Sequence, residues 1–300
     1  TCPKGHKFRN STAMNSSYFP RPALLILLLC LTWTEKKTEA AETVKAMTFN
    51  IRYASAFGAN SWPKRQAGVV QVIREQKPDI IGTQEGLHHQ LLYMDKELTE
   101  YKWIGVGREG GNRGEFMAIF YRSDRLKPLE EKHFWLSDTP KVVGSASWGN
   151  TVKRMVTWAR FLDRKTHKEF YFWNTHFDHR SQPSREKSAL LINKRVAALQ
   201  TKLPVILVGD FNAIAQSNKA YHTLTKGGGF QDTFTTAQKK VNAEWNTFNS
   251  FQKTKQGKRR IDWVLTNGPL KVTRTEIVLF KKFKQLPSDH QPVTAWLQLE

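Results

Sequence analysis

Cysteine is nearly absent from this 300-residue sequence, which contains only Cys2 and Cys30. Both lie near the N-terminus, before the segments whose apolar patterns predict strands and helices. The rest of the chain therefore forms no disulfide bond and no metal site built on thiolates. This absence is compatible with an exported protein, but it does not demonstrate export.

Long hydrophobic runs are also missing. The longest, residues 23–31, has nine consecutive apolar residues, which is too few to span a bilayer comfortably. Because Arg21 precedes this run and the small residues Thr38 and Ala40 follow it, the pattern is typical of a secretory signal cleaved near residue 40 or 41. We therefore expect a secreted or periplasmic protein. The alternative is a protein that its uncleaved leader anchors to a membrane.

Linkers rich in proline, serine or glycine are absent, and the sequence contains no internal repeat. We assign residues 1–42 to the leader and residues 43–300 to one domain. Its length of roughly 250 residues is enough to bury a sizeable core. We expect a monomer without a stable protein partner.

Acidic residues are scarce compared with basic ones, because 26 Asp and Glu stand against 47 Lys and Arg. Residues 1–42 hold six of the basic and three of the acidic residues, which leaves 41 and 23, a formal charge of +18, for residues 43–300. Such a surplus favours polyanionic partners. It would equally serve solubility or retention at an anionic envelope, and composition does not separate these explanations.

Residues 204–213 form the most informative segment that is present. Their β-branched and apolar side chains predict a buried strand, and Gly209 predicts a tight turn at its end. Asp210 and Asn212 are two residues apart, so in an extended chain their side chains point the same way. They would lie at the carboxyl end of the strand, where α/β folds often place their sites. A simple Asx turn after the strand would explain the same residues.

Other apolar segments end in polar residues of the same kind. These are Asn50, Glu85, His176 with Asp178, Asp262, and Asp289 with His290. Each of them alone is more often a surface or capping residue. Together with Asp210 they make six such ends in one chain, which indicates a shared site.

The ordered motifs resemble those of the endonuclease/exonuclease/phosphatase superfamily, which includes deoxyribonucleases, abasic-site endonucleases, neutral sphingomyelinases, inositol polyphosphate phosphatases and deadenylases. The resemblance spans nearly the whole chain after the leader and rests on Thr48-Phe49-Asn50, Gln84-Glu85, Thr175-His176-Phe177-Asp178, Gly209-Asp210-Phe211-Asn212, Ile261-Asp262 and Ser288-Asp289-His290. It implies an α/β fold, a four-layer sandwich of two packed mixed β-sheets flanked by helices. The excess of strands over helices also favours two packed sheets.

The apolar periodicity predicts the individual elements. Helices are expected at residues 64–76, 88–98, 184–200 and 217–225, and strands at residues 115–121, 126–134, 155–162, 170–176, 261–266, 272–279 and 293–299. In the third helix, Leu190 is expected on the apolar face. The glycine-rich residues 105–114 lack the ending of a nucleotide-binding loop, so we predict a mobile loop that borders the cleft through Arg108 and Arg113.

The resemblance implies a metal ion, and oxygen ligands favour magnesium, with manganese as the alternative. Glu85 is the first candidate ligand and Asp289 the second, while Asn50 would orient Glu85 or a water on the metal. Some abasic endonucleases carry aspartate two residues after this asparagine. Arg52 stands here instead, which argues against a second metal ion at that position.

The resemblance also assigns the chemistry of phosphoester hydrolysis. His290 is the predicted general base, because its ordinary pKa suits proton transfer near neutrality, and Asp262 is its carboxylate partner. Asp210 and Asn212 would position the attacking water and the phosphate.

Two further side chains complete the predicted site. His176 would donate a hydrogen bond to the phosphate or protonate the leaving oxygen. Arg154 would neutralise a non-bridging oxygen, although an arginine before a strand is equally often a surface charge. Asp178 and His179 have no assigned role beyond support of the loop after His176.

The expected activity is therefore that of a magnesium-dependent phosphodiesterase, in particular a nuclease with endo- or exonucleolytic action. The basic residues 253–260 precede Asp262 and would hold a nucleic acid, with Trp245, Phe248 and Phe251 as stacking faces or as core residues. The alternative is a phosphatase or a sphingomyelinase-type hydrolase of a small or lipid-borne phosphate. A non-catalytic binding module is disfavoured because every motif keeps its functional residues.

Overall fold

The computed structural model describes residues 42–300. The predicted signal sequence, with its cleavage site and its possible anchoring role, lies outside these residues. Within residues 42–300, no helix combines the length and the hydropathy needed to cross a bilayer.

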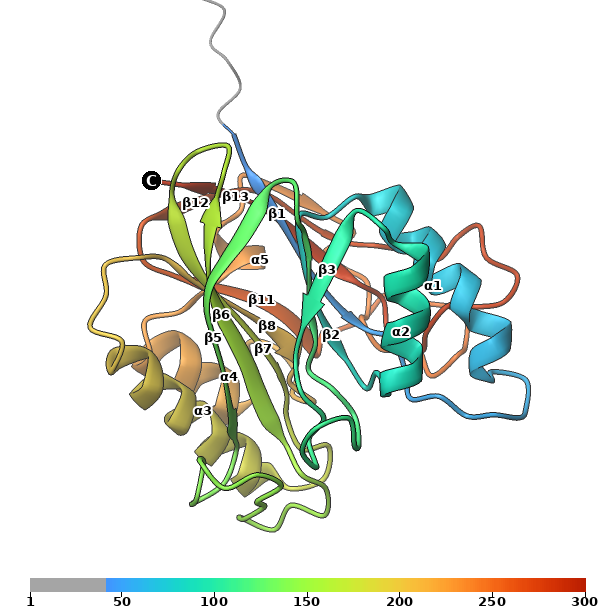
Figure 1. Ribbon diagram of the computed structural model, residues 1–300, viewed down its shortest axis with the longest axis horizontal. Coiled ribbons are helices and arrows are strands. Elements are labelled where there is room, and N and C mark those ends of the chain that lie inside the picture. Colours follow the sequence, from blue (N-terminus) through green and yellow to red (C-terminus); the bar gives the residue numbers. More distant parts are fainter. Residues whose placement is uncertain (1–41) are drawn as a thin grey trace, which may run out of the picture. The chain divides into compact units, whose positions relative to one another are not determined.

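Two β-sheets form the centre of the domain (Figure 1). The first has seven strands in the order β10 (Lys239–Val241), β12 (Leu270–Ile277), β13 (Val293–Leu299), β1 (Val44–Asn50), β2 (Ile80–Gln84), β4 (Ile119–Arg122) and β3 (Tyr101–Ile104). The second has six strands in the order β5 (Leu126–Trp135), β6 (Met155–Asp163), β7 (Glu169–His176), β8 (Val205–Asp210), β11 (Asp262–Asn267) and β9 (Gln231–Asp232). Both sheets are mixed, because the pairs β1–β2, β10–β12 and β7–β8 are parallel and the other pairs are antiparallel.

Successive side chains of a strand point to opposite faces of its sheet, and here both faces are buried and apolar. In β8, Ile206 and Val208 pack into the core between the sheets, while Val205 and Leu207 pack on the outer side. In β1, Ala46 faces the other sheet and Met47 faces outward. A strand with two buried faces reads as a continuous apolar run, as residues 205–208 do.

Helices cover the outer faces of the two sheets. Helices α1 (Trp62–Gln76) and α2 (His88–Glu97) pack on the first sheet, and α3 (Gln182–Ala197), α4 (Lys219–His222) and the π-helical turn η1 (Thr223–Gly227) pack on the second. Figure 1 shows these two groups of helices on opposite sides of the paired sheets. The short α5 (Thr233–Thr236) adds Phe234 to the core between the sheets. This arrangement confirms the predicted four-layer sandwich.

A polar bridge joins the two sheets in the middle of the core. The amide nitrogen of Asn174 in β7 donates to the carbonyls of Thr83 and Ala118, both at 2.8 Å, and its amide oxygen accepts from Gln84 Nε2 at 2.7 Å. All four residues are fully buried. Buried polar groups are stable only when they are hydrogen-bonded, so this network fixes how β7 lies against β2.

Two local predictions were wrong. Leu190 is 59 % exposed, because α3 packs through its small residues Ser184, Ser188 and Ala189 together with Ile192. Gly209 does not make a turn but lies inside β8, where a Cβ atom would come within 2.3 Å of the Thr175 carbonyl oxygen of β7.

Candidate active site

The strand register of the second sheet places three predicted site residues in one row. Asp210 at the end of β8 pairs with His176 at the end of β7 and with Asp262 at the start of β11. All three side chains are buried. The row forms because β7 and β8 are parallel while β11 runs the other way, so two strand ends and one strand start meet at the same edge.

Asn50 connects this row to the first sheet. It pairs with Gln84 across β1 and β2, which brings it beside Glu85. Its amide nitrogen donates to Glu85 Oε1 and to Asp210 Oδ2, both at 2.9 Å. One amide group therefore sets the spacing of two carboxylates from different sheets.

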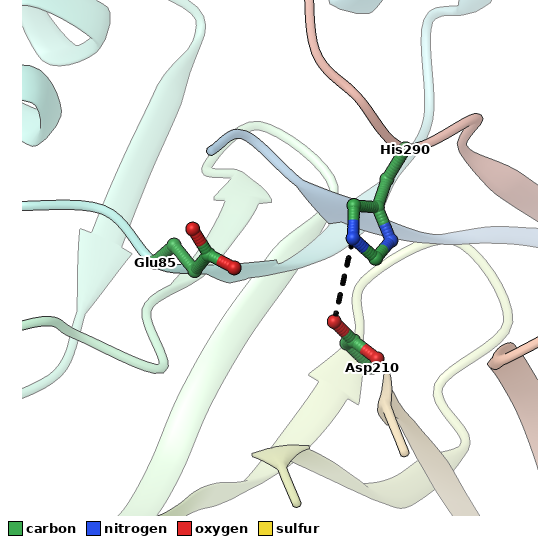
Figure 2. A group of neighbouring side chains, drawn as sticks. All are labelled: Glu85, Asp210 and His290. Carbon is green, nitrogen blue, oxygen red and sulfur yellow. Dashed lines mark ion pairs between the residues drawn. The ribbon is translucent and has the colours of Figure 1, made fainter. Parts of the chain in front are cut away.

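Glu85, Asp210 and His290 form a group whose ligand atoms all lie within 4.8 Å of one another. Figure 2 shows the three side chains converging from different segments of the chain. Glu85 and Asp210 supply carboxylate oxygens, the donors that hard divalent cations prefer, so these two carboxylates fit such an ion. Burial alone would raise the pKa of Glu85, but the charges of Arg52 and His290 and the hydrogen bonds from Asn50 and Tyr53 together lower this pKa, which keeps the carboxylate anionic.

Asp289 lies at the same side of the site. Arg52 bridges it to Glu85, with 3.6 Å from Arg52 Nε to Asp289 Oδ2 and 3.5 Å from Arg52 Nη1 to Glu85 Oε2. Burial and the neighbouring Glu85 raise the pKa of Asp289 against the influence of His290 and Arg52. The guanidinium of Arg52 thus supplies positive charge beside both carboxylates that the sequence indicated as metal ligands.

His290 and Asp262 form a close pair. Nδ1 of His290 lies 3.1 and 3.0 Å from the two carboxylate oxygens of Asp262, and its Nε2 lies 3.6 Å from Asp210 Oδ2. Burial alone would lower the pKa of His290, but the charges of Asp262 and Asp210 outweigh burial and raise this pKa to about 10. Burial raises the pKa of Asp210 to about 7, even though the nearby His290 opposes the shift.

The pKa of His176 is lowered, whereas that of His290 is raised. Asn212, whose φ is +47°, donates its amide nitrogen to the Phe177 carbonyl and places the same nitrogen 2.9 Å from His176 Nε2. This contact favours the tautomer with its proton on Nδ1, although Nε2 also lies 3.4 Å from Asp210 Oδ2. Burial and the adjacent Arg154 lower the pKa of His176 well below its usual value, so the ring is neutral at pH 7.

Arg154 is the most unusual cation of the site. It is only 3 % exposed, and Nη2 lies 3.2 Å from His179 Nδ1. Its Nε and Nη1 atoms have no hydrogen-bond partner within residues 42–300. The side chain lines the same cavity as Glu85 and Asp210. A buried guanidinium with free donors suits an anionic ligand.

The cavity above these residues has a volume of about 510 Å³. Its walls include Arg52, Tyr53, Val152, Phe248 and a pair formed by Arg108 and Glu115, whose Nη1 and Oε2 atoms are 2.7 Å apart. The glycine-rich loop thus borders the cavity through Arg108, as predicted. Arg113 is exposed and does not line the cavity.

Asp178 and His179 follow His176 in the chain and differ in their contacts. Asp178 accepts the backbone N–H groups of Arg180 and Ser181 at 2.8 and 2.6 Å, just before α3 begins. It therefore supports the loop after His176. His179 lines the cavity.

The basic residues 253–260 do not line the cavity as a group. Arg260 is buried and bonds Asp232 at 2.5 Å, and Lys258 borders a separate cavity. Arg259 alone approaches the site indirectly, because its guanidinium lies 5.2 Å from the ring centroid of Phe248. Trp245 packs against the core between the sheets instead of facing the cavity.

The sequence pattern did not reveal Arg52, Tyr53, Glu115 or Val152 as cavity residues, because none ends an apolar strand. Arg52 and Glu85 also share a left-handed backbone conformation, with φ values of +62° and +63°. Residues held in this region cost free energy and persist only where the surroundings enforce them.

Comparison with known proteins supports the resemblance found in the sequence. Residues 47–290 match the model of the Endonuclease/Exonuclease/phosphatase family. A protein of that description from Bacteroides vulgatus is 36 % identical, with a TM-score of 0.81 over 86 % of this chain and 99 % of the other. A mannosyl-6-phosphatase from Bacteroides thetaiotaomicron is 32 % identical, with a TM-score of 0.79 over 85 % of this chain and 99 % of the other. An uncharacterised protein of Acanthamoeba polyphaga mimivirus is 28 % identical over 64 % of this chain and 73 % of its own length.

Proposed function

We propose that this chain, which belongs to the Endonuclease/Exonuclease/phosphatase family, hydrolyses phosphate monoesters of small hydroxylated molecules with the help of a divalent metal ion. One observation carries the proposal: the free donors of the buried Arg154 share a cavity with the group Glu85, Asp210 and His290. A phosphate group is the ligand that both a metal ion and a guanidinium bind well.

Glu85 would hold the metal ion, with Asp210 and Asp289 as the neighbouring carboxylates and Asn50 as the group that sets their spacing. Magnesium is our first choice and manganese the second, because the donors are mainly oxygen atoms. Such an ion would neutralise charge on the phosphate, and its own charge would lower the pKa of His290 toward neutrality.

His290 would act as the general base. Asp262 holds Nδ1 and leaves Nε2 directed at Asp210, so Nε2 is the atom that would accept a proton from the attacking water. Asp210 and Asn212 would orient that water and the phosphate. The reaction class is water-dependent cleavage of a P–O bond, in which the geometry of the groups supplies much of the acceleration.

Arg154 and His176 would bind the non-bridging oxygens of the phosphate. A neutral histidine donates one hydrogen bond but has no second proton to give to a leaving group. Because burial lowers the pKa of His176 well below its usual range, we assign it the role of a donor and not that of a general acid.

The wall pair of Arg108 and Glu115 supports a small hydroxylated substrate. Oε2 of Glu115 bonds Arg108, and the remaining lone pairs of a carboxylate at this position would accept hydrogen bonds from hydroxyl groups. The relative described as a mannosyl-6-phosphatase supports the same class of substrate.

A nuclease is the second candidate. The formal charge of +18 on residues 43–300 and the placement of Arg259 over the cavity residue Phe248 favour it. The burial of Arg260 against Asp232 counts against a continuous basic track into the site.

A substrate screen of the full chain tests the proposal. We would compare mannose 6-phosphate, p-nitrophenyl phosphate, sphingomyelin and single-stranded oligonucleotides, each with magnesium and with excess chelator. Metal-dependent release of phosphate from the sugar phosphate is the expected result. Faster cleavage of oligonucleotides would favour the nuclease, and full activity in chelator would refute the metal site.

A further inference from the structure

Arg65 in α1 is a buried cation that the proposed chemistry does not use. It is 0 % exposed and forms no ion pair within 4.0 Å of a carboxylate in residues 42–300. Its guanidinium donates instead to backbone carbonyls of Asn60 (2.8 Å), Ile51 (2.8 Å), Pro287 (2.7 Å), Arg52 (3.2 Å) and Tyr53 (3.3 Å). Burial of a cation is costly. Its partners belong to two segments. The first, residues 51–60, contains the cavity residues Arg52 and Tyr53, and the second, residues 287–290, ends at His290.

The first segment connects Arg65 to Glu85 through rigid peptide groups. Because a peptide group is planar, a bond to its carbonyl also fixes the direction of its N–H. The N–H of Arg52 shares a peptide with the Ile51 carbonyl and donates to Asn50 Oδ1 at 2.9 Å. The N–H of Tyr53 shares a peptide with the Arg52 carbonyl and donates to Glu85 Oε2 at 2.9 Å. Arg65 thus holds one side of two peptides whose other side orients Asn50 and Glu85.

The conformation of this segment needs such support. Arg52 has a φ of +62°, which a side chain larger than glycine adopts only under constraint. Gln90 adds a second bond to the Arg52 carbonyl at 3.1 Å.

The second segment connects Arg65 to His290. Arg65 bonds the carbonyl of Pro287, the residue before Ser288. The hydroxyl of Ser288 donates to the Asn50 carbonyl at 2.6 Å and accepts the N–H of His290 at 3.1 Å. One guanidinium therefore ties the segment that orients Glu85 to the segment that carries His290.

We infer that Arg65 is a positioning residue that sets the distance between the metal-binding carboxylate Glu85 and the base His290. The inference rests on the proposed function, because it gives these two residues their roles. Arg65 touches neither the substrate cavity nor the reacting atoms, so it acts only through the backbone that it holds.

The test compares Arg65→Lys and Arg65→Gln with Arg125→Lys in the full chain. Arg125 is a suitable control because it is also a largely buried arginine, which bridges Asp79 (2.8 Å) and Asp163 (3.1 Å) away from the candidate site. We would measure Mg²⁺ and Mn²⁺ affinity by calorimetry, the melting temperature, and the exchange of the Arg52 and Tyr53 amide protons in metal-free protein by NMR.

In the Arg65 variants we expect metal affinity to fall roughly 10- to 100-fold, as it does when residues that orient a metal ligand by hydrogen bonds are lost. We also expect faster exchange of the two amide protons. Arg125→Lys should lower the melting temperature and leave metal affinity and both amides unchanged. Equal metal affinity in Arg65→Lys and the unaltered protein, with unchanged amide exchange, would overturn the inference.

Two outcomes separate this inference from the proposed function. If the unaltered protein binds no divalent metal, the proposed function fails, and the amide exchange in metal-free protein still decides the role of Arg65. If neither Arg65 variant folds, the unaltered protein decides it: slow exchange of the Arg52 and Tyr53 amides supports the inference, and rapid exchange overturns it.

Discussion

At the scale of single residues, the contact between His290 Nδ1 and Asp262 predicts that these two side chains act as one unit. His290→Ala should lower kcat by roughly 10²- to 10⁴-fold, the usual contribution of a general base. Asp262→Asn should also lower kcat, because the ring loses its orientation. The double variant should resemble His290→Ala alone, since a missing base cannot be misdirected. Steady-state kinetics that show two multiplying losses would assign them separate roles.

Glu85 is the residue whose loss should remove metal binding. Glu85→Gln keeps the size of the side chain but takes away the anionic charge beside Asp210 and His290, so we expect kcat to fall by roughly 100-fold or more. Calorimetry with Mg²⁺ should show weaker binding. Glu97→Gln is the matched control, because Glu97 is a half-buried carboxylate that pairs with Arg74 away from the cavity. Similar metal binding in both variants would contradict the assignment.

The pH dependence of stability in metal-free protein has a defined sign. The folded state raises the pKa of His290 to about 10 from an ordinary 6.5. A raised pKa stabilises the folded state at low pH, and this contribution is lost as the pH rises from 6.5 to about 10. The free energy of unfolding in chelator, measured by urea titration, should therefore decrease across this window. Asp262→Asn should flatten the decrease, and an equal slope in both proteins would contradict the prediction.

Sequence reasoning found most residues of the candidate site because each follows or begins an apolar strand. The register then brings them together, as it does for His176, Asp210 and Asp262. Arg65 could not be found in this way. It lies on a helix, and only the folded chain shows that its guanidinium reaches carbonyls as far apart as Ile51 and Pro287.

At the scale of elements, Asn174 of β7 is a fully buried polar link between the two sheets. Asn174→Ala would remove three buried hydrogen bonds, although the Ala118 carbonyl and the Gln84 amide keep other partners. Because one hydrogen bond contributes about 1 kcal/mol, we expect a loss of about 3 kcal/mol in the free energy of unfolding, measured with urea. Asn193→Ala removes a single 2.8 Å bond to Thr223 and should cost much less. Equal losses would show that the bridge contributes no special stability.

The long elements were predictable, and several of the short ones were not. Residues 205–208 and the helix ending at Gln76 have clear apolar patterns. The strands β3, β9 and β10 have two to four residues, too few for a periodic pattern to stand out. Their places depend on neighbouring strands, which the sequence alone does not show.

At the scale of the whole molecule, the charge of +18 on residues 43–300 and the structure of the cavity point to different substrates. The charge favours polyanions through its long-range field. The cavity instead places Glu115 beside Arg108 in its wall and keeps Arg260 bound to Asp232 outside it. Measurements at different salt concentrations separate a nucleic-acid substrate from a small one. The affinity for a nucleic acid falls more steeply with salt, the more of its phosphates the protein neutralises.

Glu115→Gln is the variant that compares the two classes of substrate directly. Removal of the negative charge should weaken recognition of hydroxyl groups and leave the charge of Arg108 uncompensated, so that it attracts a second phosphate. We expect the ratio of kcat/KM for mannose 6-phosphate to that for p-nitrophenyl phosphate to fall about tenfold, as for one lost hydrogen bond to a charged group. Between 50 and 200 mM salt, KM for the sugar phosphate should change far less than the roughly thousandfold or greater loss typical of proteins that contact many phosphates. Lys258→Gln combined with Arg259→Gln is the control, since these cations lie outside the cavity and should leave both sugar-phosphate parameters unchanged. If Glu115→Gln preserves the ratio while the control variant abolishes a steep salt dependence on oligonucleotides, the basic surface and not the cavity wall selects the substrate, and the nuclease becomes the better assignment.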